Sequence, residues 1–260
     1  MSGKLQSYLN DLSKKECPSE RTQVFKSIIR LLKTSSTSLK QSKLLAQQLA
    51  LDFGRETAES SNILLSVIHA LFDSDVTDRT EHTDLRSEIL RNFPVFLKNS
   101  KSSQAKLLNE LTNHNIPPTM VAPYVEDIIV SVASISDVTI ADQVITVIAR
   151  FLSTNQDEML TCINIWLTKL LSYTSHQASS TRISAVSVID DHIDNIVKHR
   201  DVIMHSCAGT LTKICFPALK PLYSNDDALK EILSSQVIVI MKIVGVQFKR
   251  SSTLLNATLE

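Results

Sequence analysis

The chain has 260 residues, of which 43% are apolar, so it can bury a substantial core and is not a wholly disordered protein. Its 27 basic and 27 acidic side chains cancel, which argues against the overall positive charge typical of nucleic-acid-binding domains. With only 4 glycines and 7 prolines, it has too few turn residues for a sandwich, a barrel or a doubly wound fold. The composition favours long helices joined by short polar connections.

Apolar residues recur at three- and four-residue steps along most of the chain, which is the pattern of amphipathic helices. In the first half, this pattern predicts helices at 5–12, 24–32, 44–53, 63–72, 84–98 and 101–111. Gly54 is placed to end the third helix. Pro94 lies inside the fifth, where it removes one N–H donor and is expected to kink the helix.

A break at residues 114–118 is the expected joint between two groups of helices, 1–116 and 117–260, within one continuous array. In the second half, helices are expected at 125–132, 140–152, 159–171, 183–197, 202–222 and 228–248. The run 237–246 is rich in β-branched residues and is also compatible with a buried strand. The apolar stripe that begins earlier, at Leu229, favours a helix there.

The expected helices form pairs. The second helices of the pairs begin near Ser38, Asp84, Asp137, Ser180 and Asp226, and these intervals of 43 to 53 residues are close to the roughly 40 to 47 residues of helical repeats. Residues 84–86 (DLR) open such a second helix after an apolar helix and an acidic turn. Residues 181–183 (TRI) repeat the pattern without the aspartate. This arrangement resembles the HEAT family of helical repeats, which is related to armadillo repeats.

The resemblance implies an all-α fold, a right-handed α-solenoid of about five antiparallel helix pairs. It also implies a non-catalytic scaffold or adaptor that binds protein partners within a eukaryotic intracellular complex. RNA-processing, chromosome-organising, transport and assembly complexes all contain such proteins, and the sequence does not choose among them.

Basic side chains gather near the N-terminus and at the starts of second helices, where they are expected to be exposed. We expect them to form a ridge that binds an acidic protein surface or peptide. The ridge consists of Lys26, Arg30, Lys33, Lys40, Lys43, Arg86, Arg91 and Arg182. Nucleic acid is the less favoured partner, because no aromatic side chain interleaves with these cations to stack on bases.

No catalytic, cofactor-binding or metal-binding residue is expected, because four glycines cannot compose a phosphate-binding loop and no serine has a plausible catalytic base beside it. The alternative is an all-helical, metal-dependent enzyme that uses an Asp/His-rich segment. Its candidate ligands are Asp190, Asp191, His192, Asp194, His199, Asp201, His205 and Cys207. Ligands three or four residues apart are more typical of metal sites than the seven-residue spacing of His192 and His199.

The expected location is cytoplasmic or nuclear. The four cysteines show no CxxC spacing, and residues 1–15 contain no apolar signal segment. The most apolar run, at 237–246, is far shorter than a bilayer-spanning helix, so no membrane association is expected. The sequence leaves the oligomeric state open.

Overall fold

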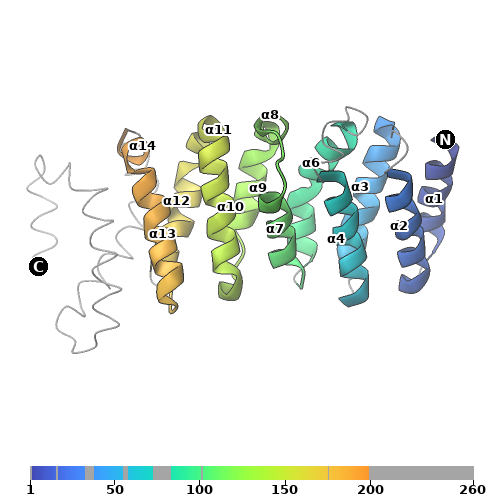
Figure 1. The fold of residues 1–260 in the computed structure, drawn as a ribbon, viewed down its shortest axis with the longest axis horizontal. Helices are drawn as coiled ribbons and strands as arrows, with labels where there is room; N and C mark the ends of the chain where they lie inside the picture. The colour runs from blue at the N-terminus through green and yellow to red at the C-terminus, as the bar shows by residue number, and fades with distance from the viewer. Residues whose placement is uncertain are drawn as a thin grey trace, which may run out of the picture. The chain divides into compact units, whose positions relative to one another are not determined.

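The computed structural model describes residues 2–15, 17–32, 38–54, 58–72, 83–100, 102–174 and 176–198 (Figure 1). All regular secondary structure in these ranges is helical, which confirms the predicted all-α class. No helix within them has both the length and the apolar character needed to cross a bilayer. The helices expected at 202–222 and 228–248, and the strand alternative at 237–246, lie outside the described residues.

The chain divides into two compact units, Met1–Ile135 and Ser136–Glu260. The helices of the first unit are α1 (Ser2–Lys14), α2 (Pro18–Leu32), α3 (Leu39–Phe53), α4 (Ala58–Phe72), α6 (Thr83–Asn99), α7 (Gln104–Asn113), α8 (Pro118–Val121), the 3-10 helix η2 (Ala122–Tyr124) and α9 (Val125–Ala133). Those described in the second unit are the 3-10 helix η3 (Val138–Ile140), α10 (Ala141–Thr154), α11 (Gln156–Thr161), α12 (Ile163–Tyr173), α13 (Ser179–Asp191) and α14 (Ile193–Lys198).

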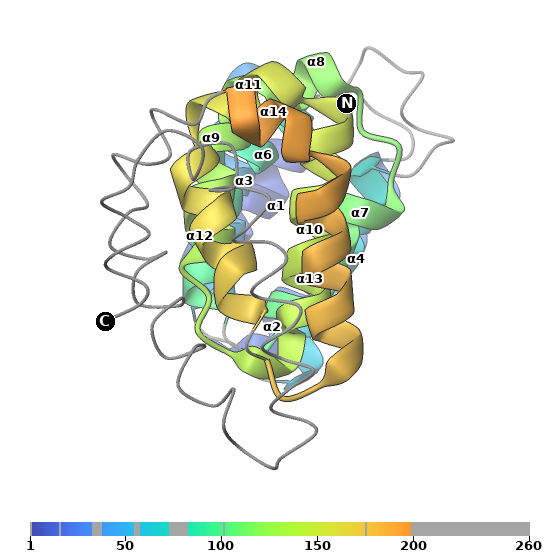
Figure 2. The same ribbon diagram turned by 90° about the vertical axis from the view of Figure 1, so that its left-hand side faces the viewer.

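In the first unit the helices pack in two rows. One row contains α1, α3, α6 and α9, each in contact with the next, and the other contains α2, α4 and α7. Figure 2 shows α3 and α6 to the left of α4 and α7. Aromatic side chains fill the core of the first row, where the rings of Phe53 and Phe96 lie 5.3 Å apart and those of Phe93 and Phe96 lie 6.1 Å apart. All three are fully buried, so the amphipathic stripes meet as their spacing requires.

The predicted joint at 114–118 lies inside the first unit, which continues to Ile135. Ile116 and Val121 are buried on either side of the two prolines, and α8, which Pro118 begins, packs against α6. Proline suits the first position of a helix, because the N–H that it lacks would have no partner within the helix. The prolines therefore redirect the chain while its apolar residues keep it packed on the unit.

In the second unit, α10 packs against α11, α12 and α13, and α12 packs against α13. The helix expected at 159–171 is interrupted at Cys162, which separates α11 from α12. The helix expected at 183–197 is likewise interrupted, at His192, between α13 and α14. The indole Nε1 of the buried Trp166 donates to the carbonyl oxygen of Met159 at 2.9 Å, so this side chain fastens α12 to α11.

An arginine occupies the fourth position of α2, α6 and α13, and all three side chains are buried. Each reaches back to carbonyl oxygens at the end of the preceding helix or in the turn that follows it. Arg21 donates to the oxygens of Leu12 and Lys15, Arg86 to that of Leu71 at 2.8 Å, and Arg182 to those of His176 and Gln177 at 2.8 and 2.9 Å. The last carbonyls of a helix have no partner within it, and a cation beside them also offsets the negative end of the helix dipole.

Arg21 has a further role, because it connects α2 to α3 as well as to α1. Its Nε lies 2.7 Å from Oδ1 of Asp52 and its Nη2 lies 2.6 Å from Oδ2, which is a two-bond pairing of guanidinium and carboxylate. Gln48 accepts a third bond from Nη2 at 3.2 Å. Both members of the ion pair have side chains that are only 8% exposed.

Replacing Arg21 with methionine is expected to lower the free energy of unfolding by about 3–5 kcal/mol, because Asp52 would keep a buried charge without its partner. Urea unfolding followed by far-UV circular dichroism measures the change. Arg30→Met, on the exposed side of the same helix, is the matched control and should change the free energy by less than about 0.5 kcal/mol. Equal stability of the two variants would contradict this role of Arg21.

Candidate functional site

Two residues of the predicted binding ridge are not on the surface. Arg86 is 2% exposed and Arg182 is 4% exposed, so the prediction that they contact a partner is wrong. Burial lowers the pKa of Arg86, although a guanidinium remains protonated at any physiological pH. The error has a physical cause: a polar residue in a first turn normally faces water, but here the side chain turns inward to the carbonyl oxygens of a neighbouring turn.

Charge reversal at either arginine is therefore expected to destabilise the protein. Arg86→Glu removes a charged hydrogen bond and buries a carboxylate beside carbonyl oxygens, which costs at least about 1.5–3 kcal/mol. Lys98→Glu, on the exposed side of α6, is the control and should leave the melting temperature nearly unchanged. Thermal unfolding followed by circular dichroism compares the two, and equal melting temperatures would show that Arg86 contributes nothing to stability.

The remaining ridge residues divide between the two rows of the first unit. Lys26 and Arg30 are exposed on α2, which packs in the row of α4. The other row carries three further ridge residues, Lys40 and Lys43 on α3 and Arg91 on α6, and all three are exposed. Lys33 lies outside the described residues. The cations of α3 and α6 therefore lie on two helices that pack against each other, and those of α2 lie in the other row.

The exposed side of α3 and α6, which we call the α3–α6 face, combines cations with apolar side chains. It comprises Lys40, Lys43, Leu51, Arg91, Val95 and Lys98. These positions are spaced three, four, seven or eight residues apart on each helix, so each set forms a single stripe. Leu51 is 53% exposed and Val95 is 42% exposed.

The two helices that carry these stripes pack against each other. The Nδ2 of Asn99 donates to the carbonyl oxygen of Ala50 at 2.9 Å, so the C-terminal ends of α3 and α6 meet. The charge is mainly positive. Glu88 lies 3.6 Å from Arg91 but is itself buried, and Asp84 is the exposed acid at the start of α6.

Sequence reasoning missed Lys98, Leu51 and Val95. The predicted helix at 44–53 contains Leu51 among its apolar residues, although Leu51 also lies at helical spacing from Lys40 and Lys43 on the polar side. That spacing is the signal that could have found it. Val95 shares its side of α6 with Arg91 and Lys98 for the same reason.

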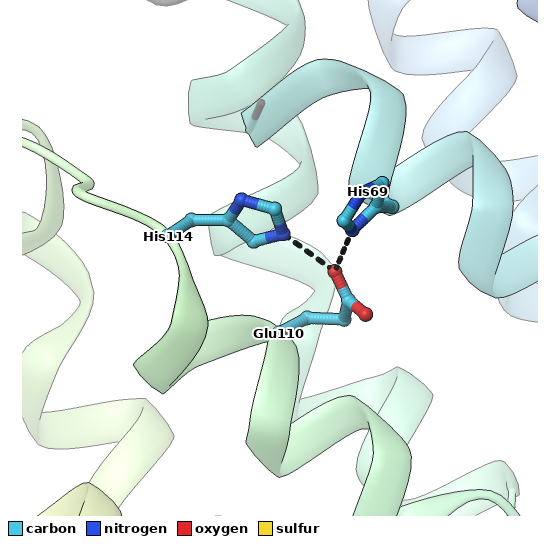
Figure 3. A group of neighbouring side chains, drawn as sticks. All are labelled: His69, Glu110 and His114. Atoms are coloured by element: carbon cyan, nitrogen blue, oxygen red, sulfur yellow. Dashed lines mark hydrogen bonds and ion pairs between the residues drawn. The ribbon is translucent and has the colours of Figure 1, made fainter. Parts of the chain in front are cut away.

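A second polar group lies between α4 and α7 in the other row and contains His69, Glu110 and His114 (Figure 3). Oε2 of Glu110 lies 2.7 Å from Nε2 of His114 and 3.3 Å from Nδ1 of His69. Glu110 and His114 are four residues apart, which brings them to the same side at the end of α7. The His69 ring meets that of His114 edge-on, with 4.7 Å between the centroids.

This group is the one set of three or more possible metal ligands among the described residues. The Asp/His-rich segment is the alternative metal site suggested by the sequence. Its described part, which includes Asp190, Asp191, His192 and Asp194, contains no set of three converging ligands. Its other candidate ligands, His199, Asp201, His205 and Cys207, lie outside the described residues. Sequence reasoning missed the His69 group because 41 residues separate His69 from Glu110, and only the packing of α4 on α7 joins them.

One tyrosine of the second unit has a strongly perturbed pKa. Burial, and next the negative charge of Asp137, raise the pKa of Tyr173 to about 12. Its hydroxyl makes no hydrogen bond within the described part of the chain, and Lys169 lies 5.1 Å from the centroid of its ring. Tyr173 is 4% exposed, so it is a core residue.

Tyr173→Phe is expected to leave the unfolding free energy unchanged or to raise it slightly, because the change removes a buried hydroxyl that lacks a partner. The raised pKa adds a pH dependence. The folded state holds the proton above pH 10, where an unfolded tyrosine releases it, so wild-type stability should fall between about pH 10 and 12. Urea unfolding across this pH range measures the loss of unfolding free energy, which should be smaller in the variant. A marked destabilisation by Tyr173→Phe at neutral pH would show that the hydroxyl makes a hydrogen bond.

Comparison with known proteins finds no matching family model, no matching curated protein and no matching solved structure.

Proposed function

We propose that this chain is a non-catalytic helical-repeat scaffold that binds an acidic segment of a partner protein on the α3–α6 face. The observation that carries the proposal is the juxtaposition of four cations with Leu51 and Val95 along two neighbouring helices. Exposed apolar residues framed by charges of one sign are typical of surfaces that bind another protein.

The α3–α6 face fits an acidic, partly apolar segment. Carboxylates of the partner would pair with Lys40, Lys43, Arg91 and Lys98, which steers association and selects against basic partners. Apolar side chains of the same segment would cover Leu51 and Val95, as when an amphipathic helix binds in a groove between helices. A protein is favoured over nucleic acid because the exposed residues of α3 and α6 include no aromatic side chain for stacking on bases.

The scaffold that we propose is a HEAT-like, right-handed α-solenoid of about five helix pairs. It is supported in the first unit by the two rows of helices and in both units by the arginine at the fourth position of α2, α6 and α13. A repeated contact of this kind is what an array of similar helix pairs would use at each turn. A place within an intracellular eukaryotic complex is part of the same proposal.

Charge reversal on the α3–α6 face tests the proposal. The variant Lys43→Glu/Lys98→Glu is compared with Lys26→Glu/Arg30→Glu, which reverses the same number of charges on α2. Both are used as tagged bait in extract of the source cells, with quantitative mass spectrometry at low and moderate salt. Proteins bound by wild type and by the α2 variant should be depleted about tenfold or more from the face variant, while all three proteins melt at the same temperature.

Equal recovery of the same partners by both variants would contradict the placement of the site. Depletion by the α2 variant alone would move it to the row of α4. Retardation of RNA or DNA by the wild type, falling steeply with salt and lost in the face variant, would assign the face to nucleic acid. These outcomes bear only on where and what the protein binds, and none of them bears on its fold.

A further inference from the structure

We propose that His69, Glu110 and His114 bind one divalent transition-metal ion, with zinc as the favoured metal, and that the ion joins α4 to α7. This inference concerns the row of α2, α4 and α7, which does not include the α3–α6 face, and it does not depend on the proposed function. It rests on the ligand atoms that two separate helices bring together (Figure 3).

The distances between the ligand atoms suit a small ion. One nitrogen from each histidine and one oxygen of Glu110 all lie within 4.8 Å of one another. Zinc bonds of about 2.0–2.2 Å in a tetrahedral site hold the ligand atoms about 3.3–3.6 Å apart. The separation of 3.3 Å from His69 to Glu110 already has this value, and that of 2.7 Å from His114 to Glu110 needs a small widening.

The local sequence holds two of the three ligands in place. Glu110 lies on the last turn of α7, and His114 follows that helix directly. The His114 side chain is 7% exposed, with Phe72 of α4 at 6.4 Å between ring centroids, so its ring is fixed by packing. Lys106, one turn earlier on α7, donates to Asn62 of α4 at 2.9 Å and so helps to align the two helices.

The donor set selects the class of metal. Two imidazole nitrogens and one carboxylate oxygen suit zinc, nickel or copper, whereas magnesium and calcium prefer sets made of oxygen alone. Without an ion, one oxygen of Glu110 accepts hydrogen bonds from both rings. With an ion, each ring would offer the lone pair of that nitrogen and carry its proton on the other nitrogen.

Coordination would be open on one side. Three protein ligands leave a tetrahedral ion one position for water. Because the His69 side chain is 58% exposed, water could reach the ion from that side. The ion would thus connect two neighbouring helices of one row, which the hydrogen bond from Lys106 to Asn62 also joins.

Calorimetric titration of zinc chloride into the full chain tests the site, with protein purified without a polyhistidine tag and stripped with chelator. His69→Ala is the first variant, since its exposed ring is not needed for folding. Glu110→Gln is the second, because it keeps the shape and one hydrogen-bond acceptor. His192→Ala is the control, a histidine of the Asp/His-rich segment outside the group. Circular dichroism checks that each variant is folded.

The wild type and His192→Ala should each bind one zinc ion per chain and melt at a higher temperature when zinc is present. His69→Ala and Glu110→Gln should bind at least about tenfold more weakly, since even the loss of an outer-shell partner costs that much. Magnesium in excess should not compete.

Absence of saturable zinc binding by the wild type would overturn the inference. Binding by His69→Ala and Glu110→Gln that equals wild type would do the same. A loss confined to His192→Ala would place the ion in the Asp/His-rich segment and would also overturn it.

Discussion

Helices that end inside a packed array leave carbonyl oxygens that water reaches poorly, and the fold of this chain depends on how those oxygens are satisfied. Buried guanidinium groups at the fourth position of α2, α6 and α13 supply the donors. Arginine suits this role because its planar head offers five N–H groups from a long apolar stem and stays charged after burial. A lysine would offer a more strongly hydrated charge without the fixed fork of donors, so the helix ends depend on the shape of the residue as well as its charge.

Arginine occurs both in the interior and on the surface of this protein, and its position in the helix decides whether it is buried or exposed. Arg86 and Arg91 belong to one helix, α6, yet the first fastens that helix to α4 and the second projects from the α3–α6 face. Packing in two rows explains the difference: each helix buries the side that meets its neighbours and leaves one narrow stripe exposed. A cation in the first turn can reach the preceding helix end, whereas one further along the exposed stripe meets only water or a partner.

Much of the fold follows from the apolar spacing alone, including the positions of α3, α4, α6, α9 and α10 and the absence of strands from the described ranges. The interruptions at Cys162 and His192 do not follow from it, because the stripe continues through both residues and only the backbone turns. The candidate sites were harder to predict. Periodicity separates polar from apolar sides but cannot show that a polar side chain such as Arg182 turns inward, and no local pattern connects His69 to a glutamate on another helix.

Trp166 gives the molecule a built-in reporter of one unit. It is the only tryptophan of the chain and lies in the core of the second unit, between α11 and α12. Helices in both units contribute to circular dichroism, but indole emission comes from the second unit alone. If the two units unfold at different denaturant concentrations, circular dichroism and tryptophan fluorescence will give different midpoints, and a single midpoint will not describe the whole chain. The order in which the two units unfold can therefore be measured without adding any label.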